Sequence, residues 1–338
     1  MRRRGFRPGG NPVWFCAALV LLALTAPVRA EPLAYVTAQG ADAVSIVDLA
    51  LGRVVETVKI GRKPAGVAVA AGGLRIYATN PEGKSFSVIE RGADGRHKVV
   101  AEVPAGGDGP LGIALDPAGT KIFVADWYTD RVHVFDAVHL QEIAVITVGQ
   151  SPAGMATDPD GRFLYVANRE SDTVSVVDLA TMKSVADIAV GKAPFGVTYD
   201  PSVPRLLVAN VQSGDVSVID PATRRETRRL KVHRFPYAVA VTPDGDRIFV
   251  TNQHDDSVSV IDGHSYAELK VITGCGYPEG ALVAPDGRSV YIACWMDDVL
   301  ARIDVASLKL ADKIAVATSP RAFGQFMAPA MTATDEWK

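Results

Sequence analysis

The most constraining feature of this sequence is a unit of about 42 residues that occurs seven times. A proline marks each unit, and successive prolines lie 46 residues apart once and 42 residues apart five times. The seven residues are Pro64, Pro110, Pro152, Pro194, Pro236, Pro278 and Pro320. Self-similarity at this period is typical of β-propellers, in which each repeat forms one blade.

Each unit contains four short candidate strands. In the unit that begins at Pro152 they are residues 154–158, 163–167, 173–178 and 185–190, and the turn Pro159-Asp160-Gly161 separates the first two. Proline, aspartate and glycine favour such a turn through a preset φ, a side-chain hydrogen bond and tolerance of positive φ. The sequence therefore predicts an all-β fold, a seven-bladed β-propeller of four-stranded blades.

The two ends of the repeat array complement each other. Residues 33–60 supply only the second, third and fourth strands of a blade, and residues 320–328 supply only a first strand. A closing blade shared between the two segments would pair the chain ends and remove an open sheet edge. We expect a single propeller domain over residues 31–330, followed by a tail at 331–338.

The N-terminal segment predicts export. A basic head, the apolar run 13–24 and the small-residue motif Val28-Arg29-Ala30 are typical of a signal peptide over residues 1–30, with cleavage after Ala30. The pair Arg3-Arg4 suggests a twin-arginine signal only weakly, and ordinary secretion is favoured. The apolar run is too short to span a bilayer, and no second such stretch follows, so we expect a periplasmic or secreted protein without a membrane span.

Removal of the signal peptide makes the chain more acidic. Five of the 35 basic residues and none of the 38 acidic residues lie within residues 1–30, which leaves a net charge of about −8. This balance argues against nucleic acid as a partner. The basic run at Arg224, Arg225, Arg228 and Arg229 falls on an outermost strand, where we expect a solvated edge.

The repeated strand motifs resemble a known family. Tyr165-Val-Ala-Asn with residues 173–178, and Phe249-Val-Thr-Asn with residues 257–262, are similar to the YVTN-repeat propellers, the bacterial YncE-like family. The resemblance covers nearly all of the predicted mature chain. It implies a secreted or periplasmic propeller, and similar propellers include lactonases, lyases and proteins encoded beside quinoprotein dehydrogenases.

Two cysteines interrupt the repeat. Cys275 stands three residues before a repeated proline, where four units have glycine, and Cys294 ends a second strand, where most units have asparagine or aspartate. We expect a disulfide in an oxidising compartment. One alternative is a copper or zinc site formed by His233, Cys275 and Cys294, with His254 as a fourth ligand. Free thiols are the other, and no cofactor is predicted beyond this alternative.

Unusual side chains gather on the loops at one face. They are predicted to form a ligand or partner rim near the channel mouth, and comprise Trp127, Tyr128, Phe235, Tyr237, Tyr277, Trp295 and Arg321. Glu279 and His233 are the candidates for a general base on this rim. The alternative is that the aromatic rings simply cap the channel.

The recurrent asparagines Asn80, Asn168, Asn210 and Asn252 invite comparison with calcium-dependent propeller lactonases. We favour a structural role, in which the asparagine satisfies backbone groups of the following turn. An acidic residue ends the third strand of every unit, and in one unit it is Glu90. The aspartates at this position are likewise interpreted as turn formers; they are Asp48, Asp136, Asp178, Asp220, Asp262 and Asp304.

Three functions remain open from the sequence. The first is a non-catalytic binding or scaffold protein that uses one propeller face for a small molecule or partner protein, in the service of a periplasmic quinoprotein-type oxidoreductase. The second is a lactonase-like or lyase-like enzyme that uses the same rim. The third is an interaction module of the cell envelope. Because no phosphate loop, zinc-protease motif, nucleophile elbow or haem-attachment motif occurs, a non-enzymatic role is favoured.

Overall fold

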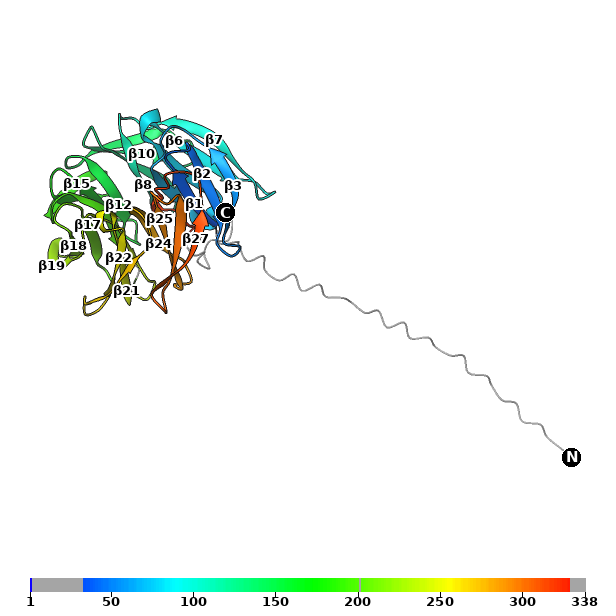
Figure 1. Cartoon of the computed structure of the whole chain (residues 1–338). Helices are drawn as coiled ribbons and strands as arrows, with labels where there is room; N and C mark the ends of the chain where they lie inside the picture. Colours follow the sequence, from blue (N-terminus) through cyan, green and yellow to red (C-terminus); the bar gives the residue numbers. More distant parts are fainter. Residues whose placement is uncertain (2–32, 201, 329–338) are drawn as a thin grey trace. The chain divides into compact units, whose positions relative to one another are not determined.

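The computed structural model describes Met1, residues 33–200 and residues 202–328. The predicted signal peptide, apart from Met1, and the predicted tail lie outside these residues. The described strands form seven sheets arranged as the blades of a propeller (Figure 1), which confirms the predicted all-β, seven-bladed fold. In the part of the chain that is described, no helix is long and apolar enough to cross a membrane.

Six blades each contain four antiparallel strands that run in sequence order from the channel outwards, and the sheet of blade 2 also holds a fifth, parallel strand. We number the closing blade as blade 1. Its strands are β1 (Leu33–Ala38), β2 (Ala43–Asp48) and β3 (Arg53–Lys59). Blade 2 comprises β4 (Gly66–Val69), β5 (Arg75–Asn80), β6 (Ser85–Arg91) and β7 (His97–Pro104). Blade 3 comprises β8 (Pro110–Leu115), β9 (Lys121–Asp126), β10 (Arg131–Asp136) and β11 (Glu142–Thr147).

The remaining four blades follow the same plan. Blade 4 comprises β12 (Pro152–Thr157), β13 (Phe163–Asn168), β14 (Thr173–Asp178) and β15 (Lys183–Ala189). Blade 5 comprises β16 (Pro194–Tyr199), β17 (Leu206–Asn210), β18 (Asp215–Asp220) and β19 (Arg225–Lys231). Blade 6 comprises β20 (Pro236–Val241), β21 (Arg247–Asn252), β22 (Ser257–Asp262) and β23 (Glu268–Thr273). Blade 7 comprises β24 (Pro278–Val283), β25 (Ser289–Cys294), β26 (Val299–Asp304) and β27 (Lys309–Ala315). Three short 3₁₀ turns lie on loops: η1 (Ala71–Gly73), η2 (Pro81–Gly83) and η3 (Gln253–Asp255).

The C-terminal segment closes the ring, as predicted, but it touches two blades. Isolated bridges pair Ala38 with Pro320 and Ala34 with Met327, so the segment runs along β1 of blade 1. Between these bridges, β28 (Phe323–Gln325) pairs in parallel with β4 of blade 2. The blue N-terminal strands consequently lie beside the orange strands of blade 7 (Figure 1), and the two blades share one hydrophobic cluster.

The glycine two residues after most repeated prolines permits close packing around the channel. A Cβ atom on Gly112 would lie 1.9 Å from the carbonyl oxygen of Ala153, and one on Gly154 would lie 2.3 Å from that of Phe195. The first strands of neighbouring blades therefore approach backbone to backbone, a spacing that a larger side chain would disturb.

The asparagine that ends the second strand has a structural role, though with other partners than expected. Asn80 Nδ2 donates to Ser85 Oγ at 3.0 Å and to Ser87 Oγ at 2.9 Å. The equivalent asparagines of blades 4, 5 and 6 donate in the same way to side chains five and seven residues later. The side chain thus links the second and third strands rather than satisfying backbone groups of the turn.

A further repeated contact joins consecutive blades and was not foreseen. In five blades, the residue before the third strand is an aspartate with φ between 46° and 58°. Its carboxylate accepts the backbone N–H of the residue 21 positions later, at 2.7–2.9 Å, in the loop that enters the next blade. We call these residues the clamp aspartates; they are Asp42, Asp130, Asp172, Asp256 and Asp298.

The basic run at residues 224–229 not only forms a solvent-exposed sheet edge but also contacts aromatic rings of the neighbouring blades. The guanidinium of Arg224 lies 5.3 Å from the ring centroid of Phe163 in blade 4, and that of Arg228 lies 5.1 Å from the ring of Tyr266 in blade 6. Cation–π contacts of this kind are favourable. The outer strand of blade 5 and the residue directly before it therefore contact both neighbouring blades.

Candidate functional site

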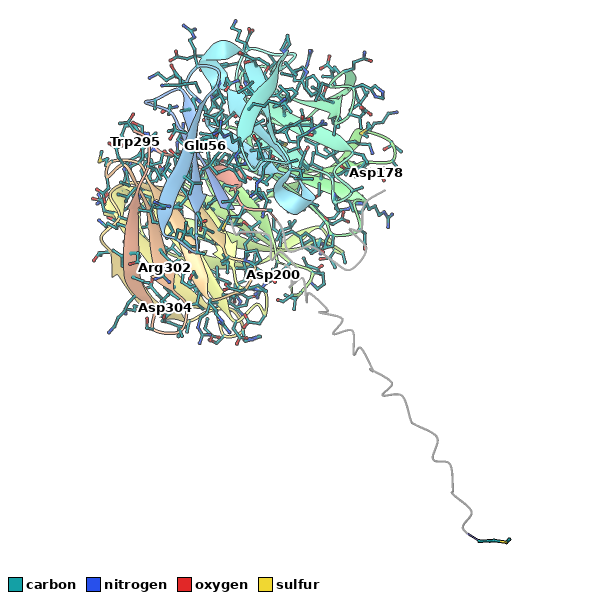
Figure 2. The ribbon with its side chains drawn as sticks, turned by 90° about the vertical axis from the view of Figure 1, so that its right-hand side faces the viewer. Glu56, Asp178, Asp200, Trp295, Arg302 and Asp304 are labelled. Carbon is teal, nitrogen blue, oxygen red and sulfur yellow. A yellow bond between two sulfur atoms is a disulfide. The ribbon has the colours of Figure 1, made fainter. Side chains whose placement is uncertain are left out.

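The loops that enter each blade, and the loops between second and third strands, open on the same face of the propeller. In blade 7, Trp295 follows β25 at this face and Asp304 ends β26 at the opposite face (Figure 2). A pocket of about 360 Å³ lies at the channel mouth on the first face. We call it the mouth pocket; it is lined by Pro81, Gly109, Leu111, Trp127, Tyr128, Arg169, Phe195, Val211, Phe235, Tyr237, Gln253, Tyr277, Glu279 and Arg321.

The mouth pocket brings together seven residues that the sequence analysis singled out, namely Trp127, Tyr128, Phe235, Tyr237, Tyr277, Glu279 and Arg321. Three of them share a position in the repeat, because Tyr237, Glu279 and Arg321 each follow a marker proline directly. Phe195 and Leu111 occupy the same position and also line the pocket. The residue after the proline therefore supplies pocket side chains from five blades.

Three of these side chains form a buried polar triad. Arg321 Nε donates to Glu279 Oε2 at 2.6 Å, and Arg321 Nη2 donates to the Tyr237 hydroxyl oxygen at 2.5 Å. Glu279 is only 3% exposed and Tyr237 only 5%. The ion pair compensates two charges that would otherwise be costly to remove from water.

The triad has shifted proton affinities. Burial raises the pKa of Glu279 above the ordinary value of a glutamate, and the neighbouring Arg321 guanidinium opposes this shift. Burial would lower the pKa of Arg321, but the charge of Glu279 and the phenol of Tyr237 outweigh this effect and raise it. Burial also raises the pKa of Tyr237, so its phenol is neutral at physiological pH.

Aromatic rings surround the triad on the channel side. The rings of Phe195 and Tyr237 stack with centroids 4.2 Å apart, and the Phe323 ring lies 4.8 Å from that of Phe195. Trp127 adds a further ring, 6.1 Å from Phe195. Phe195 and Phe323 were not among the predicted rim residues, although the position of Phe195 directly after Pro194 was a usable signal.

A second row of rings extends outwards along the rim. Phe235 stacks on His254 with centroids 3.6 Å apart, His254 lies 5.7 Å from Tyr277, and Tyr277 lies 5.7 Å from Trp295. Trp295 therefore contacts a wall of the mouth pocket but does not line it.

Blade 3 presents its rim aromatics by a local hydrogen-bond network. Asp126 Oδ1 accepts the N–H groups of Gly109 and Tyr128, each at 3.0 Å. Burial alone would raise the pKa of Asp126, but these backbone hydrogen bonds and one from Asp108 lower it. The carboxylate thus fixes the loop that carries Gly109 and the pair Trp127-Tyr128.

His233 lies apart from Glu279. The His233 ring does not line the mouth pocket; its Nε2 lies 3.4 Å from Glu268 Oε1 and its side chain is 40% exposed. Glu279 Oε2 is occupied by Arg321. The two candidate bases therefore do not form one catalytic pair.

Cys275 and Cys294 form a disulfide with a Cα–Cα distance of 5.2 Å. In blade 2, by contrast, the glycine at the first of these positions packs against the asparagine at the second. The approach is so close that a Cβ atom on Gly61 would lie 2.4 Å from Asn80 Nδ2. Blade 7 has cysteine at both positions and has Ala301 where other blades have the serine that accepts from asparagine. The disulfide occupies both sulfurs of the predicted copper or zinc set, and the described residues contain no cluster of three or more potential metal ligands.

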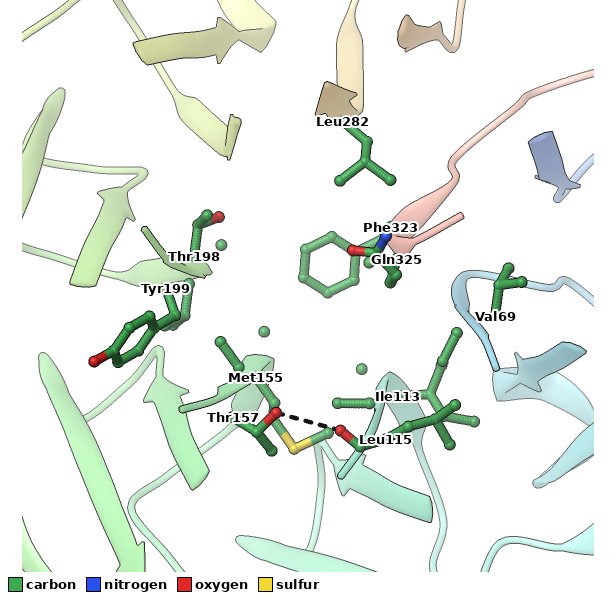
Figure 3. Close-up of a pocket in the computed structure, with 18 of the residues that line it drawn as sticks. Val69, Ile113, Leu115, Met155, Thr157, Thr198, Tyr199, Leu282, Phe323 and Gln325 are labelled. Atoms are coloured by element: carbon green, nitrogen blue, oxygen red, sulfur yellow. Dashed lines mark hydrogen bonds between the residues drawn. The ribbon is translucent and has the colours of Figure 1, made fainter. Parts of the chain in front are cut away.

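A second cavity, of about 430 Å³, has the ring of Phe323 in its wall (Figure 3). Its walls are mainly apolar and include Leu115, Met155, Leu282 and Phe323. Thr157 Oγ1 donates to the Leu115 carbonyl oxygen across one side, at 3.4 Å. Phe323 contacts Phe195 and Tyr237, which line the mouth pocket, so aromatic rings separate the two spaces.

Comparison with known proteins supports the fold and leaves the activity open. The sequence profile of the family described as "Lactonase, 7-bladed beta-propeller" matches residues 138–232. This segment includes only Arg169, Phe195 and Val211 of the pocket lining. No curated protein sequence matches the chain.

Solved structures with the same fold come from diverse proteins. Hydrazine synthase of Kuenenia stuttgartiensis is similar with a TM-score of 0.70 at 20% identity, over 82% of this chain and 93% of that chain. A functionally unknown protein from Desulfotomaculum acetoxidans gives a TM-score of 0.75 at 14% identity, over 85% and 98%. The dihydro-heme d1 dehydrogenase NirN, in complex with DHE, gives 0.66 at 17% identity, over 86% and 74%. At these identities the likeness concerns the fold alone.

Proposed function

We propose that this protein is an exported, periplasmic binding protein that holds a small molecule in the mouth pocket. The observation that carries the proposal is the buried Tyr237–Arg321–Glu279 triad inside an aromatic-walled pocket of about 360 Å³. Pockets with apolar and aromatic walls and a few convergent polar groups are the usual form of a ligand site. The disulfide and the predicted signal peptide are consistent with an oxidising compartment.

A binding role fits the chemistry of the pocket better than catalysis. Glu279, the only carboxylate that the described residues bring to the lining, is paired with Arg321, and His233 lies elsewhere. We further propose that the exposed rim around the pocket, which includes Tyr128, contacts a partner protein of a periplasmic redox system. The resemblance to propellers encoded beside quinoprotein dehydrogenases motivates this accessory role.

A thermal-shift screen of the mature protein against a metabolite library tests the proposed function. Ligands of the mouth pocket should raise the melting temperature of the wild type. They should not raise that of a Tyr128→Ala/Phe235→Ala variant, which loses two pocket walls. Phe163→Ala removes a ring that does not line the pocket and is the matched control. Hits that persist in the double variant would place the binding site elsewhere.

A lactonase is the second candidate, favoured by the family profile over residues 138–232. A panel of lactones, assayed with wild type, Glu279→Gln and His233→Ala, distinguishes the two functions. The binding proposal predicts no turnover by any of the three proteins. Turnover that Glu279→Gln abolishes would replace it with a hydrolase that works in the same pocket.

A further inference from the structure

Several polar atoms around the mouth pocket have no partner within the described chain. Arg321 uses Nε and Nη2, while Nη1 has no hydrogen bond to a described residue. Glu279 uses Oε2, and Oε1 likewise has no partner there. Gln253 is only 4% exposed and lines the pocket, yet its side-chain amide makes no hydrogen bond to any described residue. These atoms are not fully buried and remain accessible from the pocket, so they offer a ligand a donor on Arg321, an acceptor on Glu279 and an amide on Gln253 that can do both.

The charges of the pocket are already balanced before a ligand enters. Arg321 is paired with Glu279, and Arg169, which lies over the Trp127 ring, is paired with Glu170 at 3.0 Å. A carboxylate or ammonium group on the ligand would add a buried charge without a free counter-charge. Such a charge is strongly unfavourable in a desolvated site. The pocket therefore favours an uncharged ligand.

The walls of the pocket favour a flat ligand. The rings of Trp127, Phe235 and Tyr277 are only partly buried and face the same space. Aromatic faces stack on planar rings with little dependence on their substituents. A volume of about 360 Å³ lies at the small end of ligand pockets, which suits one or two fused rings.

Resting on the proposed function, we infer that the mouth pocket recognises an uncharged, planar nitrogen heterocycle whose edge carries an N–H donor beside a carbonyl acceptor. Pyrimidine and purine rings of the lactam type have this edge. The N–H would donate to Glu279 Oε1, the carbonyl oxygen would accept from Arg321 Nη1, and the Gln253 amide would pair with a second edge position. The aromatic rings would hold the heterocycle by stacking.

Titration of the mature protein with four probes, followed by tryptophan fluorescence to which Trp127 of the pocket contributes, tests this inference. The probes are uracil, hypoxanthine, 1,3-dimethyluracil, which lacks both N–H donors, and orotate, which adds a carboxylate to the uracil ring. We expect uracil or hypoxanthine to bind. We expect 1,3-dimethyluracil and orotate to bind about tenfold more weakly or worse, because each leaves a buried group unpaired.

A substitution in the pocket tests whether the probes bind there. Gln253→Leu should weaken uracil or hypoxanthine binding about tenfold, whereas Gln150→Leu, the same substitution at an exposed loop position on the same face, should leave it unchanged. Because the probe series uses the wild-type protein, it decides the inference even if Gln253→Leu folds poorly.

The outcomes separate this inference from the proposed function. Equal or tighter binding of orotate or 1,3-dimethyluracil would overturn the ligand class and leave the binding function standing. If none of the four probes binds, the ligand class is wrong, and the thermal-shift screen decides separately whether the pocket binds another molecule.

Discussion

At the scale of single residues, the positions where one blade departs from the repeat build the site. The residue after the marker proline is alanine in blades 2 and 4, but phenylalanine, tyrosine, glutamate and arginine in blades 5, 6, 7 and 1. This position lines the mouth pocket in five blades, and the differences among its side chains give the pocket its chemistry. The disulfide is a second such departure, because blade 7 alone has bonded cysteines where other blades pack a glycine against an asparagine.

The Glu279–Arg321 pair should be required for stability. Replacing Arg321 by leucine leaves the Glu279 carboxylate buried without a partner, and loss of one member of a buried pair typically costs about 3–5 kcal/mol. We expect Glu279→Leu/Arg321→Leu to recover much of this loss, because no buried charge remains. Urea unfolding of the single and double variants measures both values. A single variant as stable as wild type would show that the pair is solvated.

The disulfide should also stabilise the fold. Its cysteines are 19 residues apart, and closing a loop of this length contributes about 3 kcal/mol in the chain-entropy view. Cys275→Ala/Cys294→Ala should lose most of that free energy of unfolding. Cys275→Gly/Cys294→Asn/Ala301→Ser restores the repeat pattern of other blades and should recover part of it. Equal stability of the alanine variant and wild type would contradict this role.

At the scale of elements, strands and turns follow from the repeat, whereas side-chain directions do not. The period and the Pro-Asp-Gly turns predict the strands and the closing blade. They do not show that His233, three residues before its proline, faces Glu268 on the outermost strand β23. Nor do they reveal that the Phe323 ring packs beside the pocket, because its position depends on the pairing of β28 with β4 of blade 2. The clamp aspartates were visible in the sequence, but their role depends on contacts between blades.

The spacing of the inner strands should be intolerant of added volume. Gly112→Ala would place a Cβ atom 1.9 Å from the Ala153 carbonyl oxygen, so the two blades must separate. Overpacking of this kind typically destabilises by about 1–3 kcal/mol. The reverse change Ala238→Gly, at the equivalent position of blade 6, should lower the free energy of unfolding by less than about 1 kcal/mol. Equal effects of the two changes would argue against close packing at the channel.

The turns after the third strands should make stability depend on acid pH. Backbone and side-chain hydrogen bonds hold the pKa values of Asp136, Asp178, Asp220, Asp262 and Asp304 below their ordinary value of 3.8. Because the folded-state pKa is depressed, the stabilisation is present above pH 4 and is lost as pH falls through the folded-state values. Glu279, whose pKa is raised, contributes in the opposite direction.

Urea midpoints measured between pH 2 and pH 6 test this dependence. We expect a fall in the free energy of unfolding below about pH 4. The fall should be smaller in Asp178→Asn/Asp262→Asn, which keeps the acceptor oxygens but removes two titrating groups. A midpoint that does not change with pH over this range would contradict the role of these turns.

At the scale of the whole molecule, the C-terminal segment joins closure of the ring to the binding site. The segment 320–328 pairs with β1 and β4 and also supplies Arg321 to the mouth pocket. A chain that ends at residue 319 should unfold less cooperatively and at lower urea than one that ends at residue 328. The longer truncation product should match the full mature chain, because every described closing contact lies within it. Equal unfolding of the two truncated proteins would contradict closure by this segment.

The proposed function requires that the mouth pocket holds a small molecule. Native mass spectrometry of the mature protein, released from the periplasm under non-denaturing conditions, tests it most directly. We predict a non-covalent adduct of small-molecule mass on the wild type and on Phe163→Ala, and its loss from Tyr128→Ala/Phe235→Ala. An adduct that all three proteins retain, or a bare wild-type polypeptide that also gives no hit in the thermal-shift screen, would contradict it.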